Sequence, residues 1–293
     1  MRMQKILIPI DFSDRSTAAA EHAVALANHF HAGLIFAHVI PPVHAEFAAF
    51  EGALYTAGID SADRESVAER DRQLDCFAKR VGADAESEKV VLKGDPAREI
   101  VKFVQESPVD LIVMPTHGYG PFRRFVLGSV TAKVLHDVEC PVFTGAHVPE
   151  PPAGDPEPYH RVAVAVDFGD HSETVLRWAA EFGAEYHAQM ALIHAAPSLD
   201  ISGRGGQYLG PEWRGMLLDS AKGRAQRLLE KVGCGAEIYI DTADAHRYVP
   251  EAVSQFQANV LVVGRSPHDG LIGRLRTNAY ALIRESPCPV VSV

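Results

Sequence analysis

A glycine and a serine placed before a predicted helix indicate a phosphate-binding site. An apolar run from Leu111 to Met114 has the length and composition of a strand buried on both faces. A loop rich in proline and glycine follows it and reaches Gly128 and Ser129 directly before a helix-like segment. A helix start presents unpaired N–H groups and the positive end of the helix dipole, and glycine lets an anion approach the backbone. Phosphate binding suits this stretch best, although a lone Gly-Ser pair is more often an ordinary helix cap.

The spacing of this stretch resembles GxxGx9G[ST], the nucleotide-binding pattern of the universal stress protein family. Gly118 is separated from Gly128 by nine residues, whereas Pro115 occupies the first glycine position, so the match is incomplete. The segments that agree with the family are Thr116-His117-Gly118, Gly128-Ser129-Val130-Thr131 and Cys140-Pro141-Val142. The resemblance implies an α/β fold that is Rossmann-like and adenine-nucleotide alpha-hydrolase-like, with strand order 3-2-1-4-5.

The same resemblance implies which residues bind nucleotide. Asp11 and Val39, at the ends of the first two strands, would hold the adenine and ribose in the crevice beyond the strands. The phosphates would be surrounded by Pro115, Thr116, Gly118, Gly128, Ser129 and Val130. Arg123 and Arg124 are candidates for contacts with the β- or γ-phosphate, although a solvated charged loop is the commoner case. For Asp11 the alternative is a strand-end carboxylate that merely caps the next helix.

Pro115 changes what the expected phosphate site can offer. A proline removes one backbone donor and adds a ring close to the phosphates. The donors at Gly118 and at the helix start after Gly128 remain. We therefore expect Pro115 to weaken or reorient a bound triphosphate without abolishing the site.

Strands and helices alternate along the first half of the chain, and these elements must position the site. The apolar runs predict strands at residues 5–10, 34–40, 86–92, 111–114 and 141–144, and the segments between them predict helices ending near residues 30, 81, 106 and 137. Such alternation predicts an open parallel five-stranded sheet with helices on both faces.

The second half of the chain repeats the first. Residues 148–158 are rich in proline and predict a linker between domain 1 (residues 1–147) and domain 2 (residues 159–293). Asp167 follows an apolar run as Asp11 does, and Cys288-Pro289-Val290 repeats Cys140-Pro141-Val142. We therefore predict two similar domains, each with its own five-stranded sheet.

The second copy departs from the motif where phosphate would bind. Gly264 restores the first glycine, but Pro267 replaces Gly118, and Thr277-Asn278 stands roughly in the place of Gly128-Ser129. A Cβ at the helix start would occupy the space of a phosphate. We expect weak or absent nucleotide binding in domain 2.

Composition excludes several classes of function. The chain has 293 residues, of which 47% are hydrophobic and 23% charged, so two folded domains are expected. A formal net charge of −10 argues against nucleic-acid and anionic-membrane binding. The N-terminus does not resemble a signal peptide, and no segment approaches the ~20 apolar residues of a membrane span.

Fourteen histidines form no HExxH or HxxxH pattern, so no metal site is expected. The four scattered cysteines suit free thiols in the cytoplasm.

The resemblance implies a regulatory protein rather than an enzyme. Its ligand would be ATP or another adenine nucleotide, either alone or with Mg²⁺, and any ATP hydrolysis would be slow because no Walker lysine motif is present. The two domains would pair within the chain, and the chain could associate further as a homodimer. One alternative is a nucleotide-free scaffold that acts through protein partners or an apolar ligand. Adenylate-transferring enzymes carry HxGH or SGGxDS signatures, which this sequence lacks.

Overall fold

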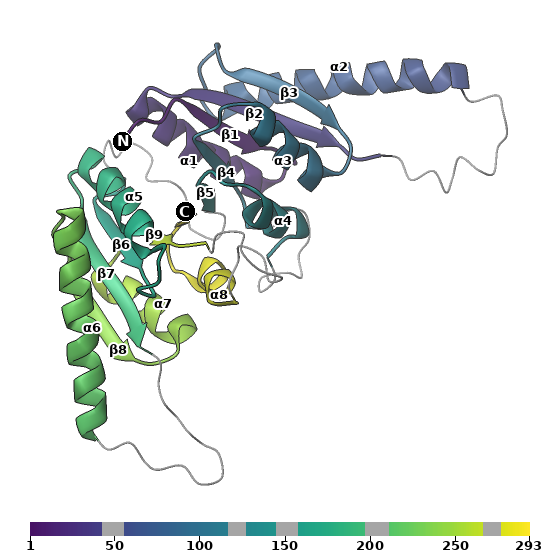
Figure 1. The fold of residues 1–293 in the computed structure, drawn as a ribbon. Coiled ribbons are helices and arrows are strands. Elements are labelled where there is room, and N and C mark those ends of the chain that lie inside the picture. The colour runs from purple at the N-terminus through teal and green to yellow at the C-terminus, as the bar shows by residue number, and fades with distance from the viewer. Residues whose placement is uncertain (43–55, 117–126, 145–157, 197–210, 266–276) are drawn as a thin grey trace, which may run out of the picture. The chain divides into compact units, whose positions relative to one another are not determined.

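The computed structural model describes residues 1–42, 56–116, 127–144, 158–196, 211–265 and 277–293 (Figure 1). Contacts divide the chain into two compact units, one of Arg2–Val142 and one of Phe143–Val293 together with Met1. This division places the last two residues of one strand, Phe143 and Thr144, with the second unit. The expected domain limits of 1–147 and 159–293 remain a prediction, and most of the proposed linker, 148–158, lies outside the described residues.

The first unit has the predicted alternation of strands and helices. Its elements are β1 (Lys5–Pro9), α1 (Asp14–Phe30), β2 (Gly33–Ile40), α2 (Thr56–Arg80), β3 (Glu88–Lys93), α3 (Pro96–Glu106), β4 (Leu111–Met114), α4 (Ser129–Asp137) and β5 (Val142–Thr144). The strands follow the order β3-β2-β1-β4-β5, which confirms the predicted strand order. β1 pairs in parallel with β2 and β4, and α1 and α2 cover one face while α3 and α4 cover the other (Figure 1).

The second unit repeats this arrangement. Its elements are β6 (Arg161–Ala165), α5 (Ser172–Glu185), β7 (Gln189–Ala196), α6 (Pro211–Val232), β8 (Glu237–Thr242), α7 (Ala245–Phe256), β9 (Val260–Val263), α8 (Thr277–Glu285) and β10 (Val290–Ser292). The strand order is β8-β7-β6-β9-β10, and β6 pairs in parallel with β7 and β9. The tandem α/β architecture predicted from the repeat is therefore confirmed.

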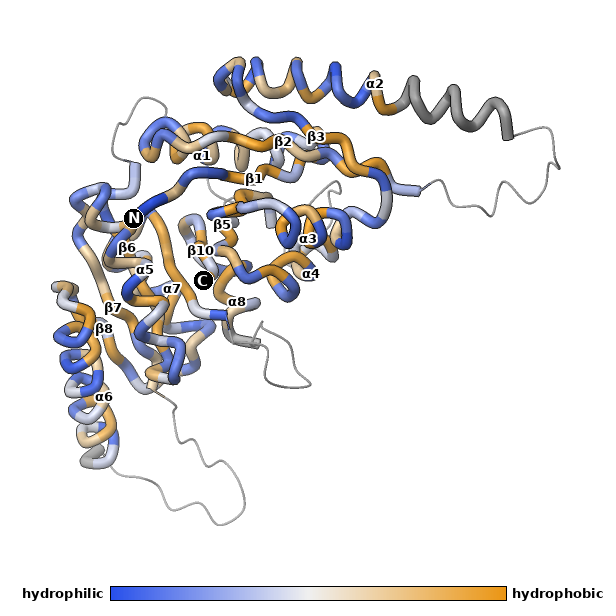
Figure 2. The backbone as a smooth tube through the Cα atoms, turned by 45° about the horizontal axis from the view of Figure 1, so that its top comes forward, coloured by the Kyte–Doolittle hydropathy of each residue, from blue (hydrophilic) through white to orange (hydrophobic). Residues whose placement is uncertain are grey.

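The central strands are buried on both faces, as their continuous apolar runs predict. Ile6, Leu7 and Ile8 of β1 and Ile112 and Val113 of β4 have no exposed surface. Alternating apolar and polar positions mark the covering helices, which Figure 2 shows as changes of colour along α6. Because parallel strands with helices on both faces have no solvated side, such apolar runs fit only in the middle of the sheet.

Helix α1 ends at Phe30, as predicted, and has a defined cap at each end. The side chain of Ser13 accepts a hydrogen bond from the backbone N–H of Ser16 and caps the helix start. At the helix end, His31 takes the left-handed conformation, with φ of 54°, and its N–H donates to the carbonyl of Ala27. Gly33 already belongs to β2, where its N–H donates to the carbonyl of Gln4 at 2.8 Å.

All four cysteines are free thiols, as their scattered positions predict. Cys288 lies just before β10 and is 4% exposed, and burial raises the pKa of its thiol to about 12. Cys140, at the equivalent place before β5, is only half-buried. Cys288 is therefore a small buried residue with little thiolate at neutral pH.

Candidate functional site

Three of the expected site residues come together at the carboxyl ends of adjacent strands. Pro9 of β1 pairs with Ala37 of β2, and the pairing of Leu7 with Ile112 sets the register to β4. If the two pairings are extended past the strand ends, Asp11 lies level with Val39 on one side and with Thr116 on the other. The strand order reverses between β1 and β4, and open α/β sheets bind ligands at such a switch point.

Asp11 is held at this crevice by the residue that caps α1. Its Oδ1 accepts hydrogen bonds from the backbone N–H of Ser13 at 3.0 Å and from the Ser13 hydroxyl at 2.6 Å. Ser13 itself caps the helix, so Asp11 supports the cap without being the cap. No described residue donates to Oδ2 of Asp11, which leaves this oxygen available as an acceptor. The structure therefore places Asp11 beside the helix cap, and its role in binding nucleotide stays a prediction.

A histidine and a phenylalanine fix the turn that follows β1. Phe12 adopts a left-handed conformation, with φ of 62°. Its ring lies against His38, with centroids 4.7 Å apart, and Nδ1 of His38 lies 2.7 Å from the carbonyl oxygen of Ile10. Burial lowers the pKa of His38, so the ring is neutral at pH 7 and Nδ1 carries the hydrogen that the carbonyl accepts. The guanidinium of Arg70 lies 5.9 Å from the centre of the Phe12 ring.

The second unit contains the same arrangement. Phe168 has φ of 57°, its ring lies 4.2 Å from that of His194, and Nδ1 of His194 lies 2.8 Å from the carbonyl oxygen of Val166. Arg224 lies over the Phe168 ring at 4.8 Å. The sequence analysis did not identify the left-handed phenylalanines of either half. The matched Phe and His positions in the two halves were the available signal.

Two hydrogen bonds join the start of α4 to the residues that directly follow β4. The N–H of Gly128 donates to the carbonyl of Thr116 at 2.8 Å, and the hydroxyl of Thr131 donates to the carbonyl of Pro115 at 2.9 Å. Gly128 has φ of −60° and ψ of 144°, and no side chain caps the helix. The first-turn N–H groups, including those of Ser129 and Val130, have no partner within the helix. These amides, rather than that of Gly128 itself, are the donors that the helix start offers.

The remaining expected contacts lie outside the described residues. Gly118, Arg123 and Arg124 belong to residues 117–126, so their assignment as phosphate contacts stays a prediction. Val39 is 8% exposed and Thr116 is 1% exposed, so both residues present little surface to the crevice. Ser129 is exposed and Val130 is half-buried at the helix start.

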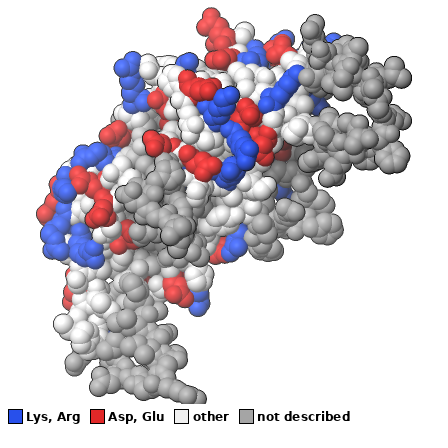
Figure 3. All heavy atoms as spheres, turned by 45° about the vertical axis from the view of Figure 1, so that its right-hand side comes forward, with Lys and Arg blue, Asp and Glu red and all other residues white. Residues whose placement is uncertain are grey.

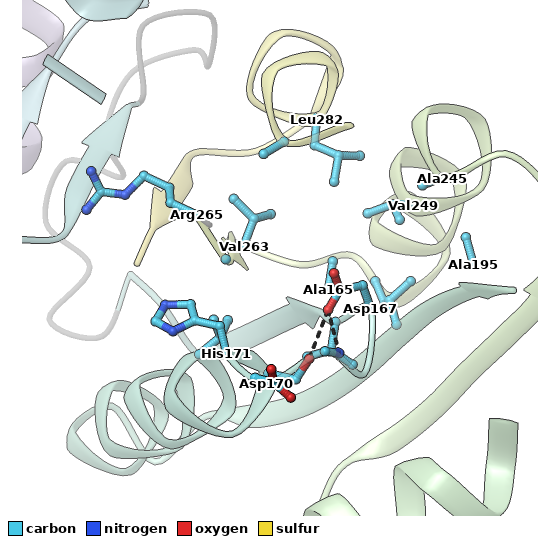
Figure 4. A pocket seen from close by; sticks show the side chains of 17 residues that line it. Ala165, Asp167, Asp170, His171, Ala195, Ala245, Val249, Val263, Arg265 and Leu282 are labelled. Carbon is cyan, nitrogen blue, oxygen red and sulfur yellow. Dashed lines mark hydrogen bonds between the residues drawn. The ribbon is translucent and has the colours of Figure 1, made fainter. Parts of the chain in front are cut away.

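In the second unit a cavity of about 320 Å³ occupies the equivalent switch point (Figure 4). Ala165 pairs with both Ile193 and Val263, which brings Asp167 to the end of β6 beside the ends of β7 and β9. Gly264 is required there, because an added Cβ would lie 2.9 Å from Cγ2 of Val175. The first unit places Pro115 at this position.

The helix starts show how the two copies correspond. α4 begins at Ser129 and α8 begins at Thr277. Thr277 therefore matches Ser129, and Arg276 stands in the sequence where Gly128 stands in the first copy. The sequence alone matches Thr277 roughly with Gly128. The difference of one residue arises because the segment between strand and helix is shorter by one in the second copy.

The described surface and interior give no sign of a resident metal or a membrane span. Within the described ranges, no three His, Cys, Asp or Glu side chains gather as a metal site requires. None of the described helices is long and apolar enough to cross a bilayer. Figure 3 shows acidic and basic side chains intermixed over the described part of one face.

Comparison with known proteins identifies the family. The family model described as "Universal stress protein family" matches residues 3–144 and again residues 158–293. A universal stress protein of Methanocaldococcus jannaschii is 34% identical over 140 residues, covering 48% of this chain and 80% of its own length. One from Mycolicibacterium smegmatis is 25% identical over 305 residues and covers 98% of this chain and 96% of its own. The crystal structure of a universal stress protein from Archaeoglobus fulgidus shares the fold with a TM-score of 0.68, at 20% identity, and covers 100% of this chain and 98% of its own. The chain therefore belongs to the universal stress protein family and carries its domain twice in tandem.

Proposed function

We propose that the first domain binds ATP or another adenine nucleotide and that this binding regulates the protein. The observation that carries the proposal is the convergence of a strand-end carboxylate, Asp11, and the uncapped start of α4 at one switch point of the sheet. Nucleotide acts as a switch only when it binds two conformations with different affinity.

Each end of the site suits one end of a nucleotide. Oδ2 of Asp11 accepts a hydrogen bond from a ribose hydroxyl or an exocyclic amine, and the backbone of Val39 lies in the same row. At the other end, the N–H groups of Ser129 and Val130 and the helix dipole favour phosphate oxygens. Thr116 and Pro115 fix this helix start through their carbonyls. Magnesium, where present, would be carried by the phosphates.

One observation favours a nucleotide-free scaffold instead. Pro115 has no N–H, and the N–H of Gly128 is already bonded to Thr116, so the backbone near β4 offers fewer donors than a glycine-rich loop does. In this alternative the protein acts through protein partners or an apolar ligand. The regulatory output would then not depend on nucleotide.

Two measurements on the full chain separate these functions. Mass spectrometry identifies any nucleotide carried through purification, and calorimetry then measures the affinity of the nucleotide-free protein for ATP, ADP and AMP. Saturable binding of one nucleotide per chain supports the proposal, whereas no binding supports the scaffold. Turnover of labelled ATP beyond trace rates would show an enzyme and contradict a purely regulatory role.

Replacing His38 by alanine is expected to lower the affinity for ATP about tenfold, which is about 1.4 kcal/mol. The ring of His38 lies against that of Phe12, and its Nδ1 donates to the carbonyl of Ile10, so its loss releases the turn that carries Asp11. The matched control is His194→Ala, which removes the equivalent ring from the second domain. Calorimetry of both variants checks the result, and equal losses of affinity would contradict a local role for His38.

A further inference from the structure

Thr131 is a buried polar side chain in the first turn of α4. It is 3% exposed, and its hydroxyl donates to the carbonyl of Pro115 at 2.9 Å. Pro115 directly follows β4, and a proline ring restricts φ, so the acceptor belongs to a stretch of backbone with little freedom. Buried hydroxyl groups are nearly always hydrogen-bonded, and this bond gives the hydroxyl of Thr131 its partner. The bond therefore ties the third residue of α4 to the end of β4.

This bond and a second one hold the helix start at two points. The N–H of Gly128 donates to the carbonyl of Thr116 at 2.8 Å. Gly128 and Thr131 are three residues apart, which is nearly one turn of an α-helix. A single bond would let the first turn rotate about its attachment, whereas two bonds fix its direction. The amides of Ser129 and Val130 lie between the two fixed points, so the bonds set where these donors point.

The second copy forms the same helix start without this hydroxyl. α4 and α8 begin at equivalent residues, so Ala279 stands in the place of Thr131. Ala279 is 6% exposed, so the position is buried in both copies, and the fold does not require a hydroxyl there. The hydroxyl is present in the copy that has Gly128 before the helix and absent from the copy that has Arg276. This difference indicates a role at the phosphate end of the first domain.

We propose that Thr131 is a positioning residue for the phosphates of the nucleotide bound by the first domain. Its hydroxyl is engaged by the carbonyl of Pro115, and it acts on the phosphates through the amides of Ser129 and Val130, whose direction it fixes. Thr131 thereby strengthens the binding of ATP and leaves unchanged the binding of adenosine, which is held at the Asp11 end. This inference rests on the function proposed for the first domain.

Thr131→Val removes the hydroxyl and keeps nearly the same side-chain shape. Calorimetry on the full chain is expected to show an ATP affinity about tenfold below that of the wild type, which is the effect of losing one hydrogen bond to a charged group, and an unchanged affinity for adenosine. Thr131→Ser keeps a hydroxyl and should retain the wild-type ratio of the two affinities. The second copy already carries alanine at this position, so Thr131→Ala is the variant to measure if valine prevents folding.

Thr144→Val is the matched control. Thr144 has no exposed surface, and its hydroxyl donates to the carbonyl of Val290 at 3.1 Å. The control therefore removes the same kind of buried bond away from the start of α4. It should lower the melting temperature and leave the ratio of ATP affinity to adenosine affinity as in the wild type. Thermal melting confirms that each variant is folded.

The ratio of ATP affinity to adenosine affinity separates positioning from a loss of stability. Equal losses for both compounds in Thr131→Val, or an unchanged ATP affinity in the folded variant, would overturn the role of Thr131 and leave the proposed nucleotide site intact. A wild type that binds no ATP would refute the proposed function and this inference together.

Discussion

Replacing Gly128 by valine is expected to lower the affinity of the first domain for ATP about 100-fold. Gly128 directly precedes the amides of Ser129 and Val130, and a branched side chain there occupies the space through which a phosphate reaches them. Hydrogen bonds to charged groups contribute about 1.5–3 kcal/mol each, so losing one or two of them accounts for a factor of this size. Calorimetry with ATP on the wild type and the variant measures the effect.

The same substitution should leave the first domain folded. Gly128 has φ of −60°, which valine also adopts, so the expected cost in the free energy of unfolding is about 1 kcal/mol. Gly235→Val is the matched control, because no heavy atom lies within 4 Å of the Cβ that it adds. ATP affinity that is equal in the two variants would show that the helix start does not hold phosphate.

The repeat could be predicted because apolar runs and strand-end aspartates recur in both halves of the sequence. The strand order could be predicted because these features match those of the family. A run such as Leu111 to Met114 can be buried on both faces only in the middle of a helix-covered sheet. Asp11 and Asp167 mark equivalent strand ends because a polar side chain is tolerated there and not within the strand. These two features were enough to place the candidate crevice.

The remaining details of the site could not be predicted because they depend on backbone conformation and on contacts distant in sequence. Phe12 and Phe168 adopt positive φ, which is uncommon for residues other than glycine, and the histidine rings that pack against them support this conformation. The bond from Gly128 to Thr116 also depends on where the chain returns after the loop. A motif gives the order of residues, but it does not show which amides are already bonded.

The two copies retain one part of the site and differ in another. Both keep the histidine, the left-handed phenylalanine and the aspartate at the end of the first strand. The first copy has Gly128 before its fourth helix, whereas the second has Arg276 before Thr277. The shared residues lie at the turn that carries the carboxylate, and the residues that differ lie at the helix start where the proposed phosphate contacts of the first domain are.

Acid is expected to destabilise the first domain through His22. This side chain lies in α1 and is 3% exposed, and burial lowers its pKa from 6.5 to about 4. Below pH 6.5 the unfolded chain binds a proton that the folded chain does not, so stability is lost as the pH falls from about 6.5 to about 4. At pH 4.5 the expected loss is roughly 2.5 kcal/mol relative to pH 7.5.

Urea denaturation at pH 7.5 and pH 4.5 measures this contribution, with His22→Gln as the variant that cannot titrate. Carboxylates also respond to acid, so the informative quantity is the difference between the wild type and the variant in their loss of stability. Wild type should lose roughly 2.5 kcal/mol more than His22→Gln. The control His246→Gln changes an exposed histidine of α7 and should behave as wild type. If His22→Gln loses as much stability as the wild type, the buried histidine does not set the acid limit of this domain.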